Sequence, residues 1–343
     1  MTKDLKTQMT CLAISEPGAP DVLAQQTRSI PEIRPGEVII KVAAAGINYP
    51  DILQRQGRYA VPPGASDLPG LEVAGTIAAI GEGASKWQVG DKVCALVPGG
   101  GYATYCRAPA VQCLPVPNGL SMAEAATLPE VYFTIWFNLA MQGDLRTVKR
   151  ILIHGGSGGI GSAAIQLAKA LDLTVFTTAS GKRSTAFCSE LGADVVIDYK
   201  TQDFVDIITK ATDGEGVDLV LDMVGGDYIQ RNIACLGQKG RLVNLYYLQG
   251  STVEVDMMPV LVKNLVLTGS LLRPQPLDVK ARIGEELIAN VWPLVESGRI
   301  RAVVDTVFDL EDAAAAHTKM EAGGLSGKLA MLTQYGRDLR DGS

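Results

Sequence analysis

A glycine-rich turn between an apolar strand and a helix constrains the fold of this chain more than any other feature. The apolar run Ile151–His154 leads directly into Gly155–Gly161, and apolar periodicity predicts a helix over Ala163–Leu171. Three glycines of the turn keep the G-x-G-x-x-G spacing: Gly156, Gly158 and Gly161. In this pattern the first glycine allows a tight turn, the second lets a pyrophosphate approach the backbone, and the third lets helix and strand pack closely. Because the amino terminus of a helix attracts phosphate, the turn predicts a dinucleotide site.

The region around this turn alternates strands and helices at a regular spacing. Apolar strand candidates recur every 22 to 24 residues, beginning near Ile151, Leu173, Val195, Asp218, Arg241 and Leu265. Helical stretches fill most of the intervals: Ala163–Leu171, Arg183–Leu191, Phe204–Thr212 and Tyr228–Leu236. Glycines stand where two of these helices should have their C-caps, at Gly192 and Gly237. Such alternation predicts right-handed βαβ units and an open parallel sheet, and six strands make a complete doubly wound domain. The alternative, an α/β domain that binds no nucleotide, is disfavoured by the glycine turn.

The end of the second predicted strand indicates which nucleotide is preferred. NAD-preferring sites place an acid there, about 20 residues past the glycines, to bind the ribose 2′-hydroxyl. The segment Val175–Arg183 contains no carboxylate and ends in Lys182 and Arg183. Hydrogen bonds to charged groups contribute on the order of 1.5–3 kcal/mol each, so one or two correspond to a roughly ten- to thousandfold preference. A solvated helix start would explain the two cations alone, but the missing acid and the two bases together favour NADPH.

The amino-terminal third and the carboxyl-terminal tail have a different pattern. Short apolar or alternating runs divided by proline and glycine turns predict an irregular, mostly antiparallel β domain: Met9–Ser15, Glu37–Ala45, Leu71–Ile80, Asp91–Val97 and Ala103–Cys113. After the sixth strand comes a helical stretch, Asp278–Ser297. Three further segments follow it: Val303–Phe308, Leu310–Met320 and Lys328–Thr333. We expect this tail to rejoin the first domain and to leave a substrate cleft between the two domains.

Composition and charge exclude several other classes of protein. The 343 residues suit about two domains, and a net charge of −6 with an isoelectric point near 5.1 argues against a nucleic-acid-binding surface. No apolar run approaches the ~20 residues needed to span a membrane, and Met1–Gln8 lacks the apolar core of a signal peptide, so we expect a cytosolic protein. Six scattered cysteines indicate buried, reduced thiols. The charged end Tyr335–Ser343 is expected to be frayed.

Several segments resemble a known family. Ala45–Asp51 (Ala-Gly-Ile-Asn-Tyr-Pro-Asp) and Gln54–Tyr59 (Gln-Arg-Gln-Gly-Arg-Tyr) resemble the zeta-crystallin-type quinone oxidoreductases of the medium-chain dehydrogenase/reductase superfamily. Pro62–Ser66 and Leu96–Gly101 are similar to the tumour-suppressor-inducible quinone oxidoreductase subgroup, with Val97 as an extra residue. The resemblance extends over nearly the whole chain. It implies an α/β fold with a GroES-like β domain and a doubly wound parallel-sheet (Rossmann) NADP-binding domain.

The resemblance also implies domain boundaries and an oligomeric state. Residues 1–127 and 273–343 would form the GroES-like substrate and catalytic domain, and residues 128–272 the Rossmann domain. Family members commonly pair through the last strand of the nucleotide-binding sheet. Leu265–Gly269 is apolar and would be an exposed edge in a monomer, so we predict a homodimer through this strand.

Zinc ligands of the superfamily are missing from this chain. Zinc-dependent alcohol dehydrogenases use a cysteine, a histidine and a third cysteine or carboxylate, where this chain has Asn48, Leu71 and, roughly, Glu130. One or two carboxylates do not hold catalytic zinc, which takes about three N, S or O ligands, and the four-cysteine structural zinc lobe is absent. His154 and His317 are interpreted as structural. We therefore expect no metal, which disfavours alcohol oxidation.

Three functional hypotheses follow from the resemblance. The first is a zinc-independent NADPH:quinone oxidoreductase, because an electron-poor quinone needs little beyond juxtaposition with NADPH. The second is an NADPH-dependent reductase of enones, alkenals or enoyl thioesters, which also needs a proton and stabilisation of the enolate oxygen. The third is a non-catalytic NADPH-binding role, structural or RNA-binding, for which some family members have been recruited. The acidic balance disfavours RNA binding.

Three residues are candidates for the catalytic site. The family's mitochondrial enoyl reductases carry a catalytic tyrosine in a segment similar to that of Tyr59, which would either donate a proton or, as we favour, position the acceptor. Asn48 would position the nicotinamide ribose or the substrate carbonyl. Asp51 would orient its neighbours, with a helix-start carboxylate as the alternative.

The family pattern further implies contacts with NADPH. Thr134 lies in the segment that enters the nucleotide domain, and the pyrophosphate turn consists of Gly156, Ser157, Gly158, Gly159, Ile160 and Gly161. The adenosine 2′-phosphate would be surrounded by Ser180, Lys182, Arg183 and Tyr199. Loops after the later strands, where the crevice of an open sheet lies, contribute Val224, Leu245, Tyr246 and Leu271. Tyr246 departs from the glycine expected after the fifth strand, which leaves the shape of the acceptor pocket open.

Overall fold

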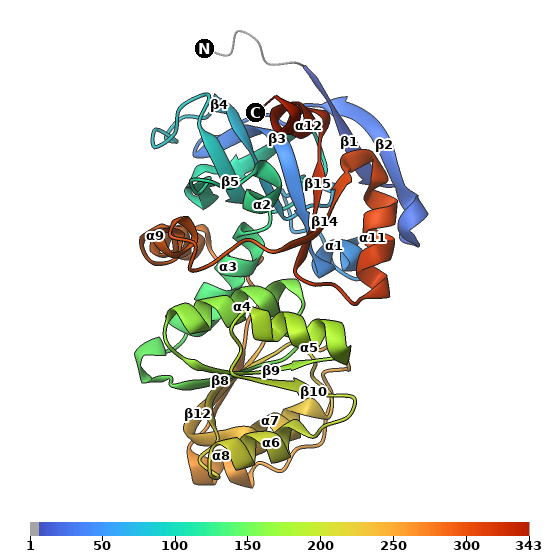
Figure 1. Ribbon diagram of the computed structural model, residues 1–343. Helices are drawn as coiled ribbons and strands as arrows, with labels where there is room; N and C mark the ends of the chain where they lie inside the picture. The colour runs from blue at the N-terminus through green and yellow to red at the C-terminus, as the bar shows by residue number, and fades with distance from the viewer. Residues whose placement is uncertain (1–6, 343) are drawn as a thin grey trace.

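The computed structural model describes residues 7–342, and in it the chain forms two lobes, each built around its own sheet (Figure 1). Residues 1–6, most of the Met1–Gln8 segment, and Ser343 lie outside the described residues. One lobe holds a six-stranded parallel sheet in the order β10-β9-β8-β11-β12-β13. Its strands are β8 (Arg150–Ile153), β9 (Thr174–Ala179), β10 (Val195–Asp198), β11 (Val217–Asp222), β12 (Leu236–Asn244) and β13 (Val266–Gly269). This is the strand order of a doubly wound dinucleotide domain, so the predicted Rossmann fold is confirmed.

Helices cover the two faces of this parallel sheet (Figure 1). They are α4 (Gly159–Ala170), α5 (Gly181–Glu190), α6 (Phe204–Ala211), α7 (Tyr228–Cys235) and α8 (Met258–Lys263). Gly192 follows α5 with φ of 98°, as expected of a glycine C-cap. The expectation for Gly237 was wrong, because α7 passes directly into β12 at Leu236 and Gly237 lies inside that strand. The short helix α8 was not predicted.

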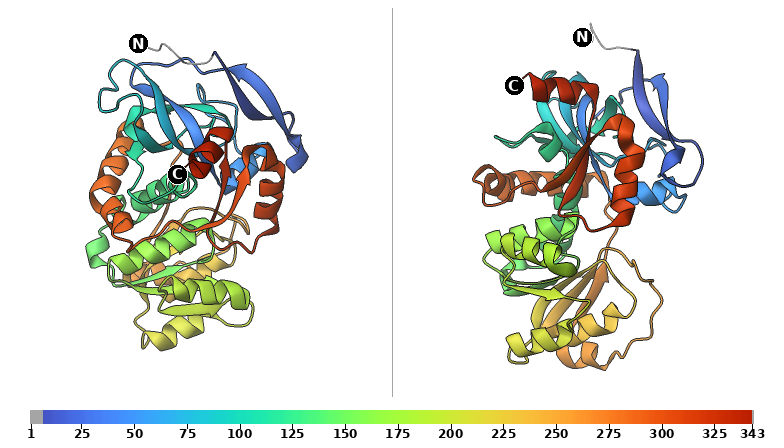
Figure 2. Two further views of the ribbon diagram at one scale, coloured as in Figure 1. Left: turned by 45° about the horizontal axis from the view of Figure 1, so that its top comes forward. Right: turned by 45° about the vertical axis from the view of Figure 1, so that its right-hand side comes forward.

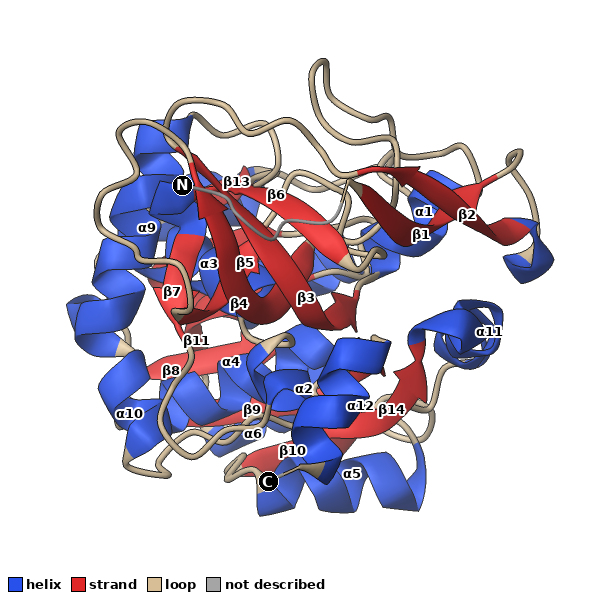
Figure 3. Ribbon diagram, turned by 90° about the horizontal axis from the view of Figure 1, so that it is seen from above, coloured by secondary structure: helices blue, strands red, loops and turns tan. Residues whose placement is uncertain are grey.

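The other lobe is mostly antiparallel, as predicted. Its seven-stranded sheet has the order β14-β15-β3-β4-β5-β7, with β6 paired to β3. The strands are β3 (Glu37–Ile47), β4 (Glu72–Ile80), β5 (Lys92–Leu96), β6 (Tyr105–Pro109), β7 (Cys113–Pro115), β14 (Val304–Asp309) and β15 (Lys328–Leu332). A separate antiparallel pair, β1 (Gln8–Ile14) and β2 (Leu23–Ser29), lies at the side of this sheet (Figure 3).

The carboxyl-terminal tail returns to the amino-terminal lobe. Strand β15 pairs antiparallel with β3 and parallel with β14, and all five of its residues are buried. Helices α11 (Ala313–Ala322) and α12 (Gln334–Asp341) lie on the same lobe, as the views of Figure 2 show. The predicted return of the tail is therefore confirmed. The expectation of a frayed end was wrong for α12, because the Thr333 side chain accepts the N–H of Gly336 and caps this helix.

Three helices lie where the two lobes meet. α2 (Met122–Ala125) and α3 (Pro129–Trp136) connect the sheets, and α9 (Leu277–Asn290) packs against α3 (Figure 1). The single helix predicted over Asp278–Ser297 is two helices, because Pro293 near the start of α10 (Trp292–Glu296) cannot continue the hydrogen bonding of α9. The remaining elements are helix α1 and short turns: α1 (Tyr49–Arg55), η1 (Pro20–Val22), η2 (Ala110–Gln112), η3 (Phe137–Met141), η4 (Leu145–Thr147) and η5 (Leu310–Asp312).

The described residues add two facts about thiols and membranes. All six cysteines are buried, and none is bonded to another. Within residues 7–342, no helix combines the length and apolar character that crossing a membrane requires.

Candidate active site

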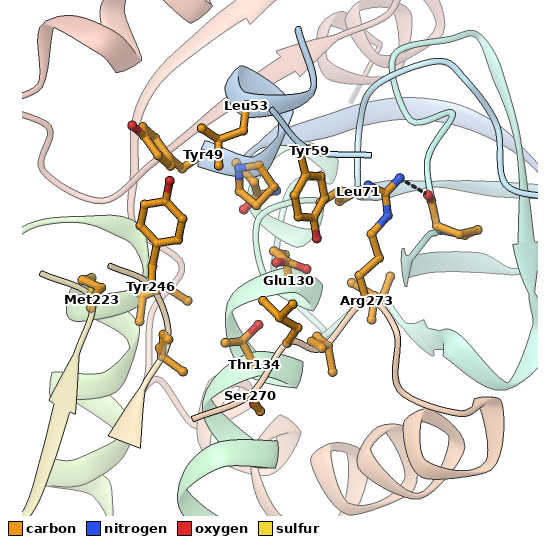
Figure 4. Close-up of a pocket in the computed structure, with 18 of the residues that line it drawn as sticks. Tyr49, Leu53, Tyr59, Leu71, Glu130, Thr134, Met223, Tyr246, Ser270 and Arg273 are labelled. Carbon is orange, nitrogen blue, oxygen red and sulfur yellow. Dashed lines mark hydrogen bonds between the residues drawn. The ribbon is translucent and has the colours of Figure 1, made fainter. Parts of the chain in front are cut away.

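A pocket of about 510 Å³ opens between the two sheets. Its walls come from the loop and helix that follow β3, from α3, and from the loops that follow the parallel strands (Figure 4). Seven of the predicted site residues line it: Asn48, Tyr59, Thr134, Ile160, Leu245, Tyr246 and Leu271. Two aromatic rings from different lobes meet edge to face at one side, since the centroids of Tyr49 and Tyr246 are 5.6 Å apart. The structure thus brings the nicotinamide-side predictions together in one apolar, aromatic cavity.

The glycine turn has the shape that a pyrophosphate requires. A Cβ at Gly161 would lie 2.2 Å from the Gly155 carbonyl oxygen, so that no side chain fits where α4 packs on the strand. A Cβ at Gly158 would meet nothing nearer than 3.5 Å, so the space beside this backbone is open. The first N–H groups of α4 have no partner within the helix. The residues of the turn therefore fit a bound dinucleotide.

The predicted 2′-phosphate residues lie at the amino terminus of α5, away from the pocket. Lys182 is exposed, and its ammonium makes no hydrogen bond or ion pair with the residues the structure describes. Arg183 is also exposed and faces Asp305 of the other lobe at 3.7 Å. Ser180 precedes the helix, and Tyr199 is exposed beyond β10. Lys182 therefore offers this end of the crevice a cation without a protein partner among residues 7–342.

The carboxylate of Asp198 also lies at the amino terminus of α5, which the sequence analysis did not predict. The segment after the second strand contains no acidic residue, but Asp198 reaches the start of α5 from the end of the third strand. Its Oδ2 accepts the N–H of Gly181 at 3.2 Å, and its Oδ1 accepts that of Lys200 at 3.1 Å. Because these bonds engage the carboxylate with backbone, Asp198 supports the loop. Val224 is half-buried and packs against the core of the Rossmann lobe, and its neighbour Met223 lines the pocket instead.

Asp51 lies behind the pocket and does not line it. Its carboxylate is fully buried and accepts the backbone N–H groups of Asn48 at 2.8 Å and Gly70 at 3.0 Å. Tyr102 adds a long hydroxyl contact of 3.4 Å, and its hydroxyl also lies 2.9 Å from His317 Nε2. Burial raises the pKa of Asp51 to about 6 despite these bonds. This geometry supports the helix-start alternative, in which Asp51 holds the backbone that presents Asn48.

A buried ammonium organises the polar end of the pocket. Lys328 Nζ lies 2.7 Å from Glu72 Oε1, and the Lys328 and Glu72 side chains are 7% and 0% exposed. Lys328 also donates to Asn48 Oδ1, while Asn48 Nδ2 donates to Glu72 Oε1 at 2.9 Å. The amide of Asn48 is thereby fixed in one orientation, because its oxygen faces a donor and its nitrogen an acceptor. Asn48 is presented to the pocket by this Lys328–Glu72 pair.

The residues at the superfamily's zinc positions do not fit a zinc ion. Asn48 is occupied by Lys328 and Glu72, Leu71 has no ligand atom, and Glu130 alone offers a carboxylate. A cation already sits beside these residues in the form of the Lys328 ammonium. No group of three or more His, Cys, Asp or Glu side chains within residues 7–342 is arranged to hold a metal. This donor set falls short of the three ligands that catalytic zinc takes.

The titratable residues that line the pocket include Tyr59, Glu130, Arg273 and Lys280. The Arg273 guanidinium lies 4.7 Å from the centre of the Tyr59 ring, and it also donates to the Pro98 carbonyl at 2.8 Å (Figure 4). Burial, followed by the Glu72 carboxylate, raises the pKa of Glu130 to about 7. Burial lowers the pKa of Lys280, whose ammonium donates to the Arg273 carbonyl at 2.8 Å.

Sequence reasoning missed several of these pocket residues. Arg273 and Lys280 follow the last parallel strand, close to the predicted Leu271. Two cations so near a predicted cofactor contact are a sequence signal that could have placed them in the site. Glu130 was considered only as a metal ligand. Glu72 and Lys328 are far apart in sequence, and only the return of β15 brings them together.

Comparisons with known proteins define the family. Residues 34–118 match the family described as the alcohol dehydrogenase GroES-like domain, and residues 191–331 match that of the zinc-binding dehydrogenases. The human synaptic vesicle membrane protein VAT-1 homolog is 31% identical over 343 residues, with 94% of this chain and 86% of that protein covered. The quinone oxidoreductase of Sus scrofa is 29% identical over 328 residues, with coverage of 94% and 98%.

A longer relative and two solved structures extend the comparison. A phenolphthiocerol/phthiocerol polyketide synthase of Mycobacterium tuberculosis is 32% identical over 335 residues, and the match covers 95% of this chain but only 15% of that protein. The CurK enoyl reductase structure has a TM-score of 0.83 and 30% identity, covering 95% and 99% of the two chains. The structure of mycobacterial Rv1454c complexed with NADPH has a TM-score of 0.82 and 29% identity, covering 94% and 99%.

Fold, pocket and comparisons together define a two-domain nucleotide-dependent oxidoreductase. The chain belongs to the medium-chain dehydrogenase/reductase superfamily, among its quinone oxidoreductase-like members. The resemblance inferred from the sequence is confirmed at this level. The tumour-suppressor-inducible subgroup stays a prediction.

Replacing Lys182 with Glu tests the 2′-phosphate assignment. Because the ammonium has no partner among the described residues and a carboxylate would repel a phosphate, we expect Lys182→Glu to lose its preference for NADPH over NADH, by roughly ten- to a thousandfold. The dissociation constants of the two coenzymes, measured by fluorescence titration, check this. Lys210→Glu, on the exposed side of α6, makes the same charge change elsewhere and should alter neither constant. An undiminished NADPH affinity in Lys182→Glu would show the assignment to be wrong.

Removing Lys328 tests the role of the buried pair. Lys328→Met leaves Glu72 charged and unpaired in the interior, so we expect a loss of about 3–5 kcal/mol in the free energy of unfolding. Adding Glu72→Gln should recover part of that loss, because the orphaned charge is gone. Urea unfolding of the single and double variants gives the values. Lys169→Met breaks a half-exposed pair with Asp194 and serves as the control, with an expected loss below about 1 kcal/mol.

Proposed function

We propose that this protein is a zinc-independent NADPH:quinone oxidoreductase. The observation that carries the proposal is the pocket, which is mostly apolar, has the rings of Tyr49, Tyr59 and Tyr246 in its walls, and lacks a zinc-compatible donor set among the described residues. A flat, electron-poor quinone suits such walls and needs no Lewis acid. The quinone oxidoreductases among the relatives support the same substrate class.

The coenzyme of the proposed reaction is NADPH, which supplies a hydride when bound. Its pyrophosphate would lie on the turn formed by Gly156–Gly161, where the backbone is open and α4 begins. Thr134, Leu245 and Leu271 would hold the nicotinamide end in the pocket. Asn48, fixed by the Lys328–Glu72 pair, would donate its remaining amide hydrogen to the ribose or to the carbonyl of the acceptor.

A second candidate is the NADPH-dependent reduction of enones, alkenals or enoyl thioesters. One observation favours it, namely a carboxyl group in the pocket, Glu130, whose pKa is raised to about 7. Enone reduction needs a proton donor, whereas quinone reduction depends far less on one. This candidate is supported by an enoyl reductase among the similar structures and by a polyketide synthase among the proteins of similar sequence.

The acceptor assay separates these functions. We expect the purified protein to oxidise NADPH faster than NADH in the presence of quinones, followed spectrophotometrically over a panel of quinones and a panel of enones. Turnover confined to enones would replace the first function with the second. Binding of NADPH without turnover of either panel would support the non-catalytic role. Stoichiometric bound zinc with oxidation of simple alcohols would refute the proposal.

We further propose that the protein forms a homodimer through β13. This strand pairs with β12 on one side only among the described residues, and Val266 and Leu267 are 50% and 36% exposed. The neighbouring α8 exposes Met258, Leu261 and Val262 at 59%, 76% and 66%. An exposed apolar edge strand is a site for strand pairing, and a two-fold dimer would cover it.

Light scattering after gel filtration tests the dimer. The protein at micromolar concentration should have twice the mass of the 36.3 kDa chain. Val266→Lys should shift the mass toward that of the monomer, because two lysines would face each other across the paired edge. Val307→Lys, an exposed valine on the edge strand β14, is the control and should leave the dimer intact. A monomer mass for the unaltered protein would contradict the proposal.

A further inference from the structure

We propose that the Glu130 carboxyl is the proton donor of the pocket and acts on α,β-unsaturated carbonyl substrates. The proposal rests on the second of the two proposed functions and gives it a named acid. Four observations carry it: the free side chain of Glu130, its place on α3, the charges around it, and the engagement of Tyr59 elsewhere.

The Glu130 side chain is held in the pocket without a partner. Its backbone N–H donates to Glu72 Oε2 at 2.9 Å, which fixes the first turn of α3. The carboxyl itself makes no hydrogen bond and no ion pair with any residue from 7 to 342, although it lines the pocket. In Figure 4 it lies between Tyr59 and Thr134. A carboxyl in such surroundings is available to a ligand, because no protein group saturates it.

The helix places this acid near the expected nicotinamide. Glu130 and Thr134 are four residues apart on α3, so their side chains lie on one face with about 5–6 Å between Cβ atoms. Thr134 is one of the residues proposed to hold the nicotinamide. An acceptor laid against the nicotinamide would therefore have the Glu130 carboxyl one helical turn away, on the side of Tyr59.

Burial, helped by nearby carboxylates, raises the pKa of Glu130 and favours its protonated form near neutral pH. Burial and the Glu72 carboxylate raise its pKa to about 7, and Asp51 acts in the same direction. Lys328 and Arg273 oppose the shift without cancelling it. The titratable and charged groups that face Glu130 from the elements around it are Glu72 on β4, Asp51 on α1, Tyr59 after α1, Lys328 on β15, Arg273 after β13 and Lys280 on α9. An acid with a pKa near the working pH is the most effective proton donor.

Tyr59 is the less suitable donor of the two. Burial raises its pKa further above the ordinary tyrosine value, which is already about 10. Its ring is stacked on the Arg273 guanidinium at 4.7 Å, and this contact fixes the ring as part of the wall. We therefore assign Tyr59 to positioning the acceptor and Glu130 to the proton.

The proposed reaction adds one hydride and one proton across a carbon–carbon double bond. The β-carbon of the acceptor gains a C–H bond from the hydride that NADPH loses in becoming NADP+, and the π electrons shift to form an enolate. The O–H bond of Glu130 then breaks, and its proton forms the C–H bond at the α-carbon. The resulting carboxylate regains a proton from water before the next turnover, so that each cycle consumes one NADPH and one proton.

The kinetic test compares two variants at this position. For the unaltered protein, kcat with an enone should be constant below pH about 7 and fall above it, because the acid form of Glu130 is lost as the pH rises. Glu130→Gln should lower kcat by roughly 10²- to 10⁴-fold and abolish this pH dependence. Glu130→Asp should restore part of kcat and the pH dependence. Glu285→Gln, the same change on the exposed face of α9, is the control and should leave both unchanged.

A second measurement needs neither coenzyme nor turnover. Infrared titration of the coenzyme-free protein should show a protonated carboxyl that is lost around pH 7, present in Glu285→Gln and missing in Glu130→Gln. Absence of that titration in the unaltered protein overturns the proposal. So does an unchanged enone kcat in Glu130→Gln combined with a large fall in Tyr59→Phe, which would make Tyr59 the donor. Failure of the unaltered protein to reduce any enone would instead refute the enone activity, and with it the need for a donor.

Discussion

The buried contact between Lys328 and Glu72 is the constraint on which the rest of the site depends. One ammonium lies among three carboxyl groups, from Asp51, Glu72 and Glu130, and it pairs directly with only one of them. Burying this ammonium costs free energy unless an opposite charge lies beside it. The strands β15 and β4 must therefore hold Lys328 and Glu72 next to each other across β3. The same pair orients Asn48, and its Glu72 member receives the N–H of Glu130 in the first turn of α3. Polar chemistry in the pocket is therefore fixed by a contact between segments that are far apart in the chain.

The Rossmann half of the fold was predictable because its signals are local. A strand, a glycine turn and a helix adjoin each other around Gly155–Gly161, and apolar strands recur at short, even intervals. Each prediction there depended on residues a few positions apart. The wrong C-cap prediction at Gly237 shows where local signals fail. No loop separates α7 from β12, so the residue types around Gly237 do not show where the helix ends and the strand begins.

The pocket between the lobes was predictable only in part. Asn48, Tyr59 and Thr134 were found through a family resemblance, and they do line the pocket. Glu130 was recognised as a residue at a metal position, but its acid character depends on burial and on neighbours that the sequence does not place beside it. Asp198 likewise reaches α5 from another strand. Residues whose chemistry arises from long-range proximity remain invisible to local patterns.

The place of β15 in its sheet has a consequence for biosynthesis. This strand lies between β14 and β3, so the amino-terminal lobe cannot close before residues 328–332 have left the ribosome. The Rossmann lobe, by contrast, is continuous in sequence and is able to fold earlier, because domains generally fold as units during synthesis. Until then the Ala44–Ile47 part of β3 lacks the partner that β15 provides, which leaves an exposed strand edge of the kind that favours aggregation.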